Sequence, residues 1–248
     1  MNHSRLWQPQ LGIIIAISII FASCSANDES VARPFEHQYN DYARLLSQHV
    51  TEDGWVDYQS LVADSAALHH VIATFERVPP DTLNSFARNQ KLAFWINAYN
   101  AVTLLSIVDA YPVSSIKEID GVWDEREWAI AGRSVTLNQI EHEILRKDFD
   151  EPRIHFAVNC ASIGCPPLIP EPYRPSSLDS QLGNSAEQFL RDPLRNTFHP
   201  SEKAAELSEI FQWYGTDFST QYPSDSPEDQ PEELRPALNY IAEALPDS

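Results

Sequence analysis

The sequence predicts an α+β fold: a mostly helical single domain with a central buried helix and a small antiparallel sheet. Several segments repeat apolar residues at the three- and four-residue spacing of a helix. One of them, residues 84–110, is apolar on nearly every side. Only short stretches alternate like strands, and turn residues lie between them, so the sheet is expected to consist of hairpins.

The first half of the chain is expected to be helical. Residues 36–50 have helical apolar spacing, whereas residues 54–58 are expected to turn and continue as a short extended piece. A helix over residues 61–78 should end at Pro79-Pro80, because proline cannot continue a helix. The helix over residues 84–110 follows, and since a helix that is apolar all round is buried all round, it should form the core.

The second half is expected to alternate between hairpins, helices and loops. Residues 128–137 should form a hairpin that turns at Gly132. The other expected elements are, in chain order, a helix over 138–146, a strand over 153–158, a Pro-rich loop over 166–175, a helix over 178–194, a second hairpin flanked by Phe198 and Leu207, and a C-terminal helix over 232–245.

The N-terminus has the pattern of a secretory signal. Arg5 supplies a positive charge, residues 11–21 are apolar, and Phe21-Ala-Ser leads into Cys24. This ending resembles the lipobox of bacterial lipoproteins, which implies cleavage before Cys24, lipidation of that residue and an extracytoplasmic protein anchored in a membrane. Ser25 is not the Asp that commonly retains such proteins in the inner membrane, which favours the outer membrane of a Gram-negative bacterium. The alternatives are an uncleaved anchor helix, or an ordinary signal in which Cys24 is incidental.

We therefore expect four segments. They are a lipoprotein signal peptide (1–23), a flexible tether (24–35), a globular domain (36–222), and an acidic Pro-rich linker with a C-terminal helix (223–248). Cleavage before Cys24 leaves 225 residues (248 − 23), which is enough for one domain with a real core.

Composition excludes several classes of function. The net charge of −19 argues against nucleic acid and against electrostatic docking on anionic lipid, because both need clustered Lys and Arg. The chain has no Walker motif and no dinucleotide fingerprint, so no cofactor is expected. No second His lies at metalloprotease spacing from His142, so no metal site is expected either.

Three clusters of polar residues have the potential for chemistry. In the first, Asn97 and Asn100 share a face of the apolar helix, with Tyr99 between them. Two buried amides are costly unless they are satisfied. They either donate to a ligand carbonyl or oxyanion, or bond loop backbone and stabilise the fold; the second interpretation is favoured, because most buried amides are satisfied within the protein.

The second cluster lies in residues 137–146. Asn138 and Glu141 have the spacing of a capping box, which would explain Glu141 without catalysis. His142 and Arg146 are expected on one helix face, one turn apart. His142 is a candidate general base, although a lone helical histidine is more often a surface residue.

The third cluster follows the expected strand over residues 153–158. The expected strand gives way to a turn at Cys160. The thiol of Cys160 would be activated by a nearby histidine such as His155 or His142. Alternatively, outside the cytoplasm Cys160 and Cys165 can form a disulfide, and their spacing alone does not decide between the two.

Four motifs together resemble the DUF547 family, a domain of unknown function. They are Gly-Trp-Val-Asp-Tyr (54–58), Ala-Phe-Trp-Ile-Asn-Ala-Tyr-Asn (93–100), Leu-Asn-Gln-Ile-Glu-His-Glu-Ile-Leu-Arg (137–146) and Pro-Arg-Ile-His-Phe-Ala-Val-Asn-Cys-Ala-Ser (152–162). The resemblance covers about residues 40 to 220 and implies no biochemical activity. The family's hallmark positions match Trp95, Asn97, Tyr99, Asn100, Glu141, His142, Arg153, His155 and Cys160. The second cysteine is often Ser in eukaryotic relatives, which implies that a disulfide to Cys165 is dispensable.

Two functions from different classes remain open. The first is a cell-envelope hydrolase or acyl or amide transferase, in which Cys160 attacks, His142 or His155 is the base, and Asn97 and Asn100 or Arg153 polarise a carbonyl. The second is a non-catalytic lipoprotein that binds a small molecule or an envelope polymer, with a Cys160–Cys165 disulfide. Since isolated buried polar groups are costly, we expect Cys160, both histidines and Arg153 to share one cleft walled by Asn97, Tyr99 and Asn100.

Overall fold

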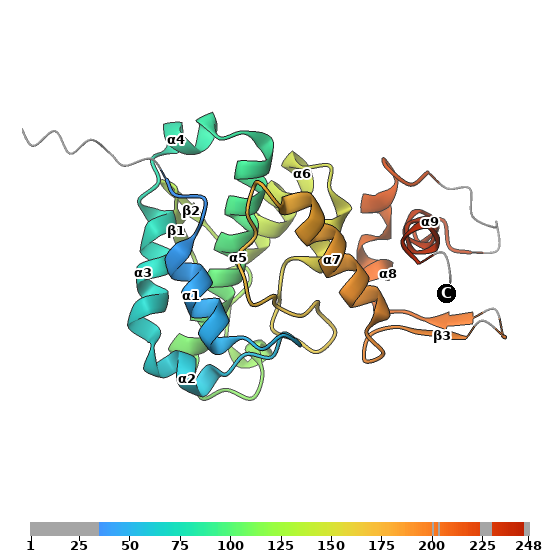
Figure 1. The fold of residues 1–248 in the computed structure, drawn as a ribbon, viewed down its shortest axis with the longest axis horizontal. Coiled ribbons are helices and arrows are strands. Elements are labelled where there is room, and N and C mark those ends of the chain that lie inside the picture. The colour runs from blue at the N-terminus through green and yellow to red at the C-terminus, as the bar shows by residue number, and fades with distance from the viewer. Residues whose placement is uncertain (1–34, 200, 203, 224–229, 246–248) are drawn as a thin grey trace, which may run out of the picture. The chain divides into compact units, whose positions relative to one another are not determined.

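The computed structural model describes residues 35–199, 201–202, 204–223 and 230–245, all within one compact unit that begins at Phe35 (Figure 1). The predicted signal peptide (1–23), Cys24 and all but the last residue of the predicted tether lie outside the described residues. The helices of the first half are α1 (Asn40–His49), α2 (Tyr58–Ala63), α3 (Ser65–Glu76), α4 (Pro80–Ser85), α5 (Arg88–Ala110) and η1 (Ile116–Glu118). The second half contains β1 (Trp128–Ile130), β2 (Arg133–Val135), η2 (Gln139–Leu145), α6 (Arg146–Asp148), η3 (Pro152–Phe156), α7 (Leu178–Arg191), β3 (Thr197–His199), β4 (Ala204–Glu206), α8 (Ile210–Tyr214), η4 (Gly215–Phe218) and α9 (Arg235–Ala244).

Helix α5 is the central buried helix that the sequence predicts. It is buried without interruption from Leu92 to Val108 and packs against α3 (Figure 1). Its length and composition alone would also suit a membrane span, but 94% of its most apolar window is buried inside the domain. The helix begins at Arg88 rather than at residue 84, because the backbone is extended at Phe86 and Ala87 and separates α5 from the short helix α4.

The helices before α5 are shorter than the apolar spacing predicts. Helix α1 begins at Asn40, since Tyr39 has a left-handed backbone with φ of 52°. The predicted helix over 61–78 is two helices that meet at Asp64. The first of them starts earlier than predicted because the carboxylate of Asp57 accepts a hydrogen bond from the Ser60 backbone N–H.

Over the described residues, the β structure consists of two separate two-stranded antiparallel sheets, β1–β2 and β3–β4, and one isolated antiparallel bridge between Val50 and Val56. The first hairpin turns at Ala131 and Gly132, which both have positive φ, so the expected turn at Gly132 is confirmed. The mostly helical α+β fold follows the sequence prediction.

The predicted strand over residues 153–158 is wrong. Residues Pro152–Phe156 form the 3₁₀ helix η3, which starts with proline at its first position and is capped by the Glu151 side chain. Ile154, His155 and Phe156 are all buried, so the apparent alternation reflects a short turn covered on several sides rather than a two-faced strand.

The C-terminal helix is part of the domain's packing. Tyr240 of α9 stacks on Phe156 of η3, with ring centroids 5.8 Å apart, and both lie in an apolar cluster with Phe211 and Phe218. This cluster fixes α8 and η4 beside η3, which brings the two ends of the candidate site together.

Candidate functional site

A cavity of about 180 Å³ lies where α5, η2, η3 and α8 meet. We call it the Glu141 pocket. It is lined by Tyr99, Trp123, Asn138, Glu141, His142, His155, Val158, Cys160, Cys165, Pro166, Ile210, Trp213 and Tyr214.

Glu141 is held at the pocket by two tyrosines from distant parts of the chain. Its Oε2 accepts a hydrogen bond from the Tyr99 hydroxyl at 2.9 Å, and its Oε1 accepts one from the Tyr214 hydroxyl at 2.9 Å. Burial and the nearby charge of Glu141 raise the pKa of both tyrosines, so their hydroxyls stay protonated and donate. Each carboxylate oxygen keeps a second lone pair that can accept from a further group.

The expected cap role of Glu141 is wrong. The reciprocal capping box is made two residues earlier: the Thr136 backbone N–H donates to Gln139 Oε1 at 3.0 Å, and the Gln139 N–H donates to Thr136 Oγ1 at 3.2 Å. The helix that follows, η2, is a π-helix, a form that recurs at functional sites. Glu141 is therefore free of a capping role, and its carboxylate lines the pocket.

A chain of charged and hydrogen-bonded groups runs beside Glu141. Arg146 donates to Nδ1 of His142 at 3.2 Å, which confirms that these residues share one helix face. Because a guanidinium only donates, Nδ1 of His142 accepts and its ring hydrogen is on Nε2. Arg146 also forms a bidentate pair with Asp217 at 2.6 and 2.8 Å.

His155 completes this chain. Its Nε2 donates to Asp217 Oδ2 at 2.8 Å, and its ring stacks on Tyr214 with centroids 4.0 Å apart. Burial lowers the pKa of His155, although the neighbouring Asp217 opposes this effect. Burial would raise the pKa of Asp217, but hydrogen bonds from Arg146 and His155 outweigh it and hold that pKa well below its usual range. The neutral imidazole keeps Nδ1 as an acceptor, and this atom makes no hydrogen bond to the described residues.

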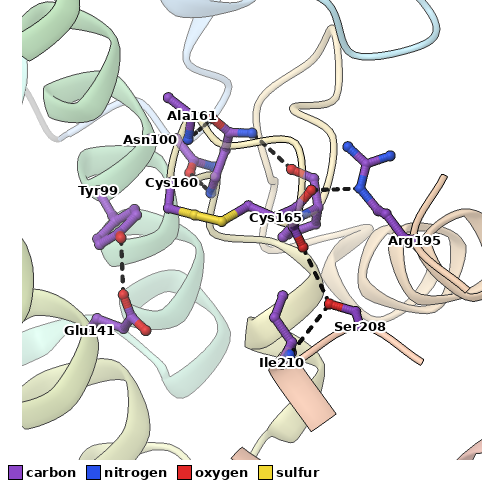
Figure 2. The surroundings of a disulfide bond; sticks show 12 residues. Tyr99, Asn100, Glu141, Cys160, Ala161, Cys165, Arg195, Ser208 and Ile210 are labelled. Carbon is purple, nitrogen blue, oxygen red and sulfur yellow. Dashed lines mark hydrogen bonds between the residues drawn. A yellow bond between two sulfur atoms is a disulfide. The ribbon is translucent and has the colours of Figure 1, made fainter. Parts of the chain in front are cut away.

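Cys160 and Cys165 form a disulfide at the pocket wall (Figure 2). Their Cα atoms are 5.9 Å apart, within the ordinary range for such a bond. The loop is fixed further by Arg195, whose Nε donates to the Cys165 carbonyl at 2.7 Å. A nucleophilic thiolate at Cys160 therefore requires prior reduction.

A thiol titration tests this disulfide. In the Cys24→Ser full chain, Cys160 and Cys165 are the only cysteines, so denaturation without reductant should expose no thiols, and reductant should release two. Replacing both cysteines by alanine should lower the free energy of unfolding by about 2 kcal/mol, as expected for closing so short a loop. Two reactive thiols before reduction would contradict the bond.

The remaining predicted site residues lie away from the pocket. Asn97 donates to the Tyr173 carbonyl at 2.7 Å and accepts from the Tyr173 N–H at 2.9 Å. Asn100 donates to the Ala157 carbonyl at 2.9 Å and accepts from the Asn159 N–H at 2.8 Å. Both amides thus bond loop backbone to α5, the structural role that was one of their two interpretations.

Arg153 also has a structural role. It pairs with Glu151 at 2.7 Å and with Asp179 of α7 at 2.9 Å, and it does not line the Glu141 pocket. The structure therefore brings together Tyr99, Cys160, His142 and His155 as expected, but it does not place Asn97, Asn100 and Arg153 with them.

The sequence analysis missed the residues of α8 and η4 that contact the site: Tyr214 lines the pocket, and Asp217 lies behind it, bonded to His155 and Arg146. Tyr214 and Asp217 reach Glu141 and His155 from 73 and 62 residues further along the chain. Their segment, Gln-Trp-Tyr-Gly-Thr-Asp-Phe (212–218), has no regular periodicity; its only signal is an acid among closely spaced aromatic residues. Among the residues that the structure describes, no group of three or more His, Cys, Asp or Glu is placed to hold a metal ion.

Comparison with known proteins identifies a family for the central part of the chain. Residues 83–190 match the family model described as "Protein of unknown function, DUF547", which assigns this segment to that domain family. The match includes Tyr99, Glu141, His142, His155 and both cysteines of the disulfide, whereas Tyr214 and Asp217 lie beyond it. No curated protein and no solved structure matches the chain.

Proposed function

We propose that this DUF547-domain protein is a cell-envelope lipoprotein that binds a small molecule in the Glu141 pocket. The observation that carries the proposal is that polar side chains from separate elements converge on one cavity, which the stability of the fold alone does not require. Glu141, the Nε2–H of His142 and Nδ1 of His155 offer acceptors and a donor at one cavity with aromatic walls. A few placed polar groups in an apolar cavity are typical of ligand sites.

A larger cleft on the domain supports ligand binding less well. Its volume is about 680 Å³. It lies along residues 161–163, between the two cysteines, and exposes the side chains of Trp55, Ile163 and Leu194. Two of its charged groups, Asp192 and Arg195, pair with each other, and the third, Asp53, is an exposed surface residue. The Glu141 pocket instead gathers a carboxylate and two imidazoles at one small cavity, so we assign the ligand to it.

The second candidate function is a thiol-dependent hydrolase or transferase that acts only after reduction. It is supported by Cys160 lining the same cavity as His155, whose imidazole is oriented by Asp217. The disulfide argues for the binding function instead, since the oxidised sulfur has no free thiolate to attack a substrate.

Binding is tested by thermal unfolding of the detergent-solubilised full chain with three probes: benzylamine, benzyl alcohol and benzoate. A cavity of this size admits a single six-membered ring. At about ten times its dissociation constant, a bound probe should raise the melting temperature by about 3–6 °C. We expect a dose-dependent rise with at least one probe.

Two variants locate the binding. Asn138→Trp places a large ring at a partly exposed lining position and should abolish the rise. Asn184→Trp makes the same change at an exposed position of α7 and should leave it intact. If no probe shifts the melting temperature, or if the shift survives Asn138→Trp, the pocket is not the binding site.

The membrane anchor is tested separately through Cys24. The full chain, expressed in a Gram-negative host, should incorporate labelled palmitate and sediment with membranes. Cys24→Ser should lose the label and either release the protein or leave an unprocessed precursor, because three acyl chains hold firmly at about 0.8 kcal/mol per buried methylene. Cys160→Ser is the matched control and should keep the label. An unlabelled native chain would exclude lipidation.

A further inference from the structure

We infer that the Glu141 pocket selects organic cations, namely ligands that carry a primary ammonium group on a small apolar body, with Glu141 as their counter-ion. This inference rests on the proposed function and names its ligand class. It follows from the charge, the free lone pairs and the walls of the pocket.

Glu141 is a carboxylate without a cation of its own. Within the described part of the chain, no Lys, Arg or His forms an ion pair with it. The guanidinium beside it, Arg146, is already engaged in its bidentate pair with Asp217 and in its bond to His142. The negative charge at the pocket is therefore left for a ligand to balance.

The two tyrosine hydroxyls orient this charge without neutralising it. Each takes one lone pair of the carboxylate at 2.9 Å and leaves a second acceptor position on each oxygen. An ammonium group carries three N–H donors, so it can serve both oxygens and still donate to a further acceptor such as Nδ1 of His155. Hydrogen bonds between such charged partners are about twice as strong as neutral ones.

The walls and the field of the protein favour the same ligand. Trp123 and Trp213 line the pocket, and Trp213 keeps 59% of its surface exposed. The faces of tryptophan rings attract cations. The net charge of −19 raises the local concentration of cations around the protein and repels anions. A carboxylate or phosphate ligand would instead meet the like charge of Glu141 in the pocket wall.

The three isosteric probes separate the ligand class from binding itself. In titration calorimetry of the detergent-solubilised full chain at pH 7 and low salt, benzylamine should bind at least about tenfold more tightly than benzyl alcohol, and benzoate should not bind. Glu141→Gln keeps the side-chain shape and one acceptor oxygen. It should weaken benzylamine about ten- to a hundredfold and change benzyl alcohol less than about twofold. The matched control, Glu187→Gln, removes an exposed carboxylate on α7 and should change neither.

A second measurement needs no variant at the site. Raising the sodium chloride concentration from about 0.05 to about 0.5 M should weaken benzylamine binding to the native chain and leave benzyl alcohol unchanged, since salt screens the charge pair. If benzyl alcohol or benzoate binds as tightly as benzylamine, the cation preference is overturned while the proposed function stands. The same holds if Glu141→Gln leaves benzylamine binding unchanged. If Asn138→Trp abolishes the binding of none of the probes, both the cation preference and the proposed binding function fail.

Discussion

Replacing Trp95 by alanine is expected to lower the free energy of unfolding by about 3–5 kcal/mol, as for other large aromatic truncations in cores. Trp95 is only 3% exposed, lies on the most buried helix of the domain and packs edge-on against Phe94, with ring centroids 5.3 Å apart. Close packing around α5 leaves the surrounding side chains little freedom to fill the cavity. Urea unfolding of the full chain, followed by far-UV circular dichroism, measures the change.

The matched control is Trp55→Ala. Trp55 is 61% exposed, so the same change in side-chain volume should alter stability by no more than about 0.5 kcal/mol. If Trp95→Ala unfolds at the same urea concentration as the native chain, α5 does not have the central role that its burial assigns to it.

Helix α5 and the first hairpin could be predicted because their signals are local. An unbroken apolar segment of helix length can only be stable when it is buried, and this requirement holds whatever packs around it. Gly132 likewise indicates a turn by itself, since positive φ costs glycine little. The boundaries were less predictable: α5 begins later because Phe86 and Ala87 are extended, a choice that the apolar pattern does not record.

The segment around His155 could not be assigned because its burial depends on distant residues. Phe156 and Ile154 read as one face of a strand, but α9 and the α8 region cover Phe156 in the folded domain. A pattern of period two over so few residues also fits a short turn that is buried on several sides. The proline and the Glu151 cap decide the local conformation in favour of a 3₁₀ helix.

The candidate site likewise contains residues that the sequence indicated and residues that it did not. Glu141, His142, His155 and Cys160 stood out as polar residues in apolar, regular segments, and they do line one cavity. Asn97 and Asn100 also stood out as polar residues in an apolar helix, but their amides bond loop backbone instead of lining the cavity. Asp217 gave only a weak signal, an acid among aromatic residues, yet it holds both Arg146 and His155 in place.

Replacing Asp217 by asparagine should lower the free energy of unfolding at pH 7 by about 2–3 kcal/mol, because Arg146 loses its bidentate partner in a largely buried position. The side chain of Asp217 is 22% exposed, so solvent screens little of the loss. Asp179→Asn is the matched control: it breaks an Arg–Asp pair in which the aspartate is 88% exposed, and it should cost less than about 1 kcal/mol.

Asp217→Asn should also change how the free energy of unfolding depends on pH. Relative to the native chain, its slope should be steeper in one pH range and shallower in another. Asp217 has a depressed pKa, so its contribution is complete above the unfolded value of about 3.9 and is lost as the pH falls below it. Burial depresses the pKa of His155, so its contribution is likewise lost as the pH falls from about 6.5, and removing Asp217 depresses that pKa further. As the pH falls below about 6.5, the variant should therefore keep losing stability, at up to about 1.4 kcal/mol per pH unit, over a wider range than the native chain. Below about pH 4 the native chain should lose stability more steeply, because only it still has the Asp217 carboxylate to protonate. Urea unfolding at each pH gives both slopes, and parallel curves for the two proteins would show that Asp217 does not set the charge of His155.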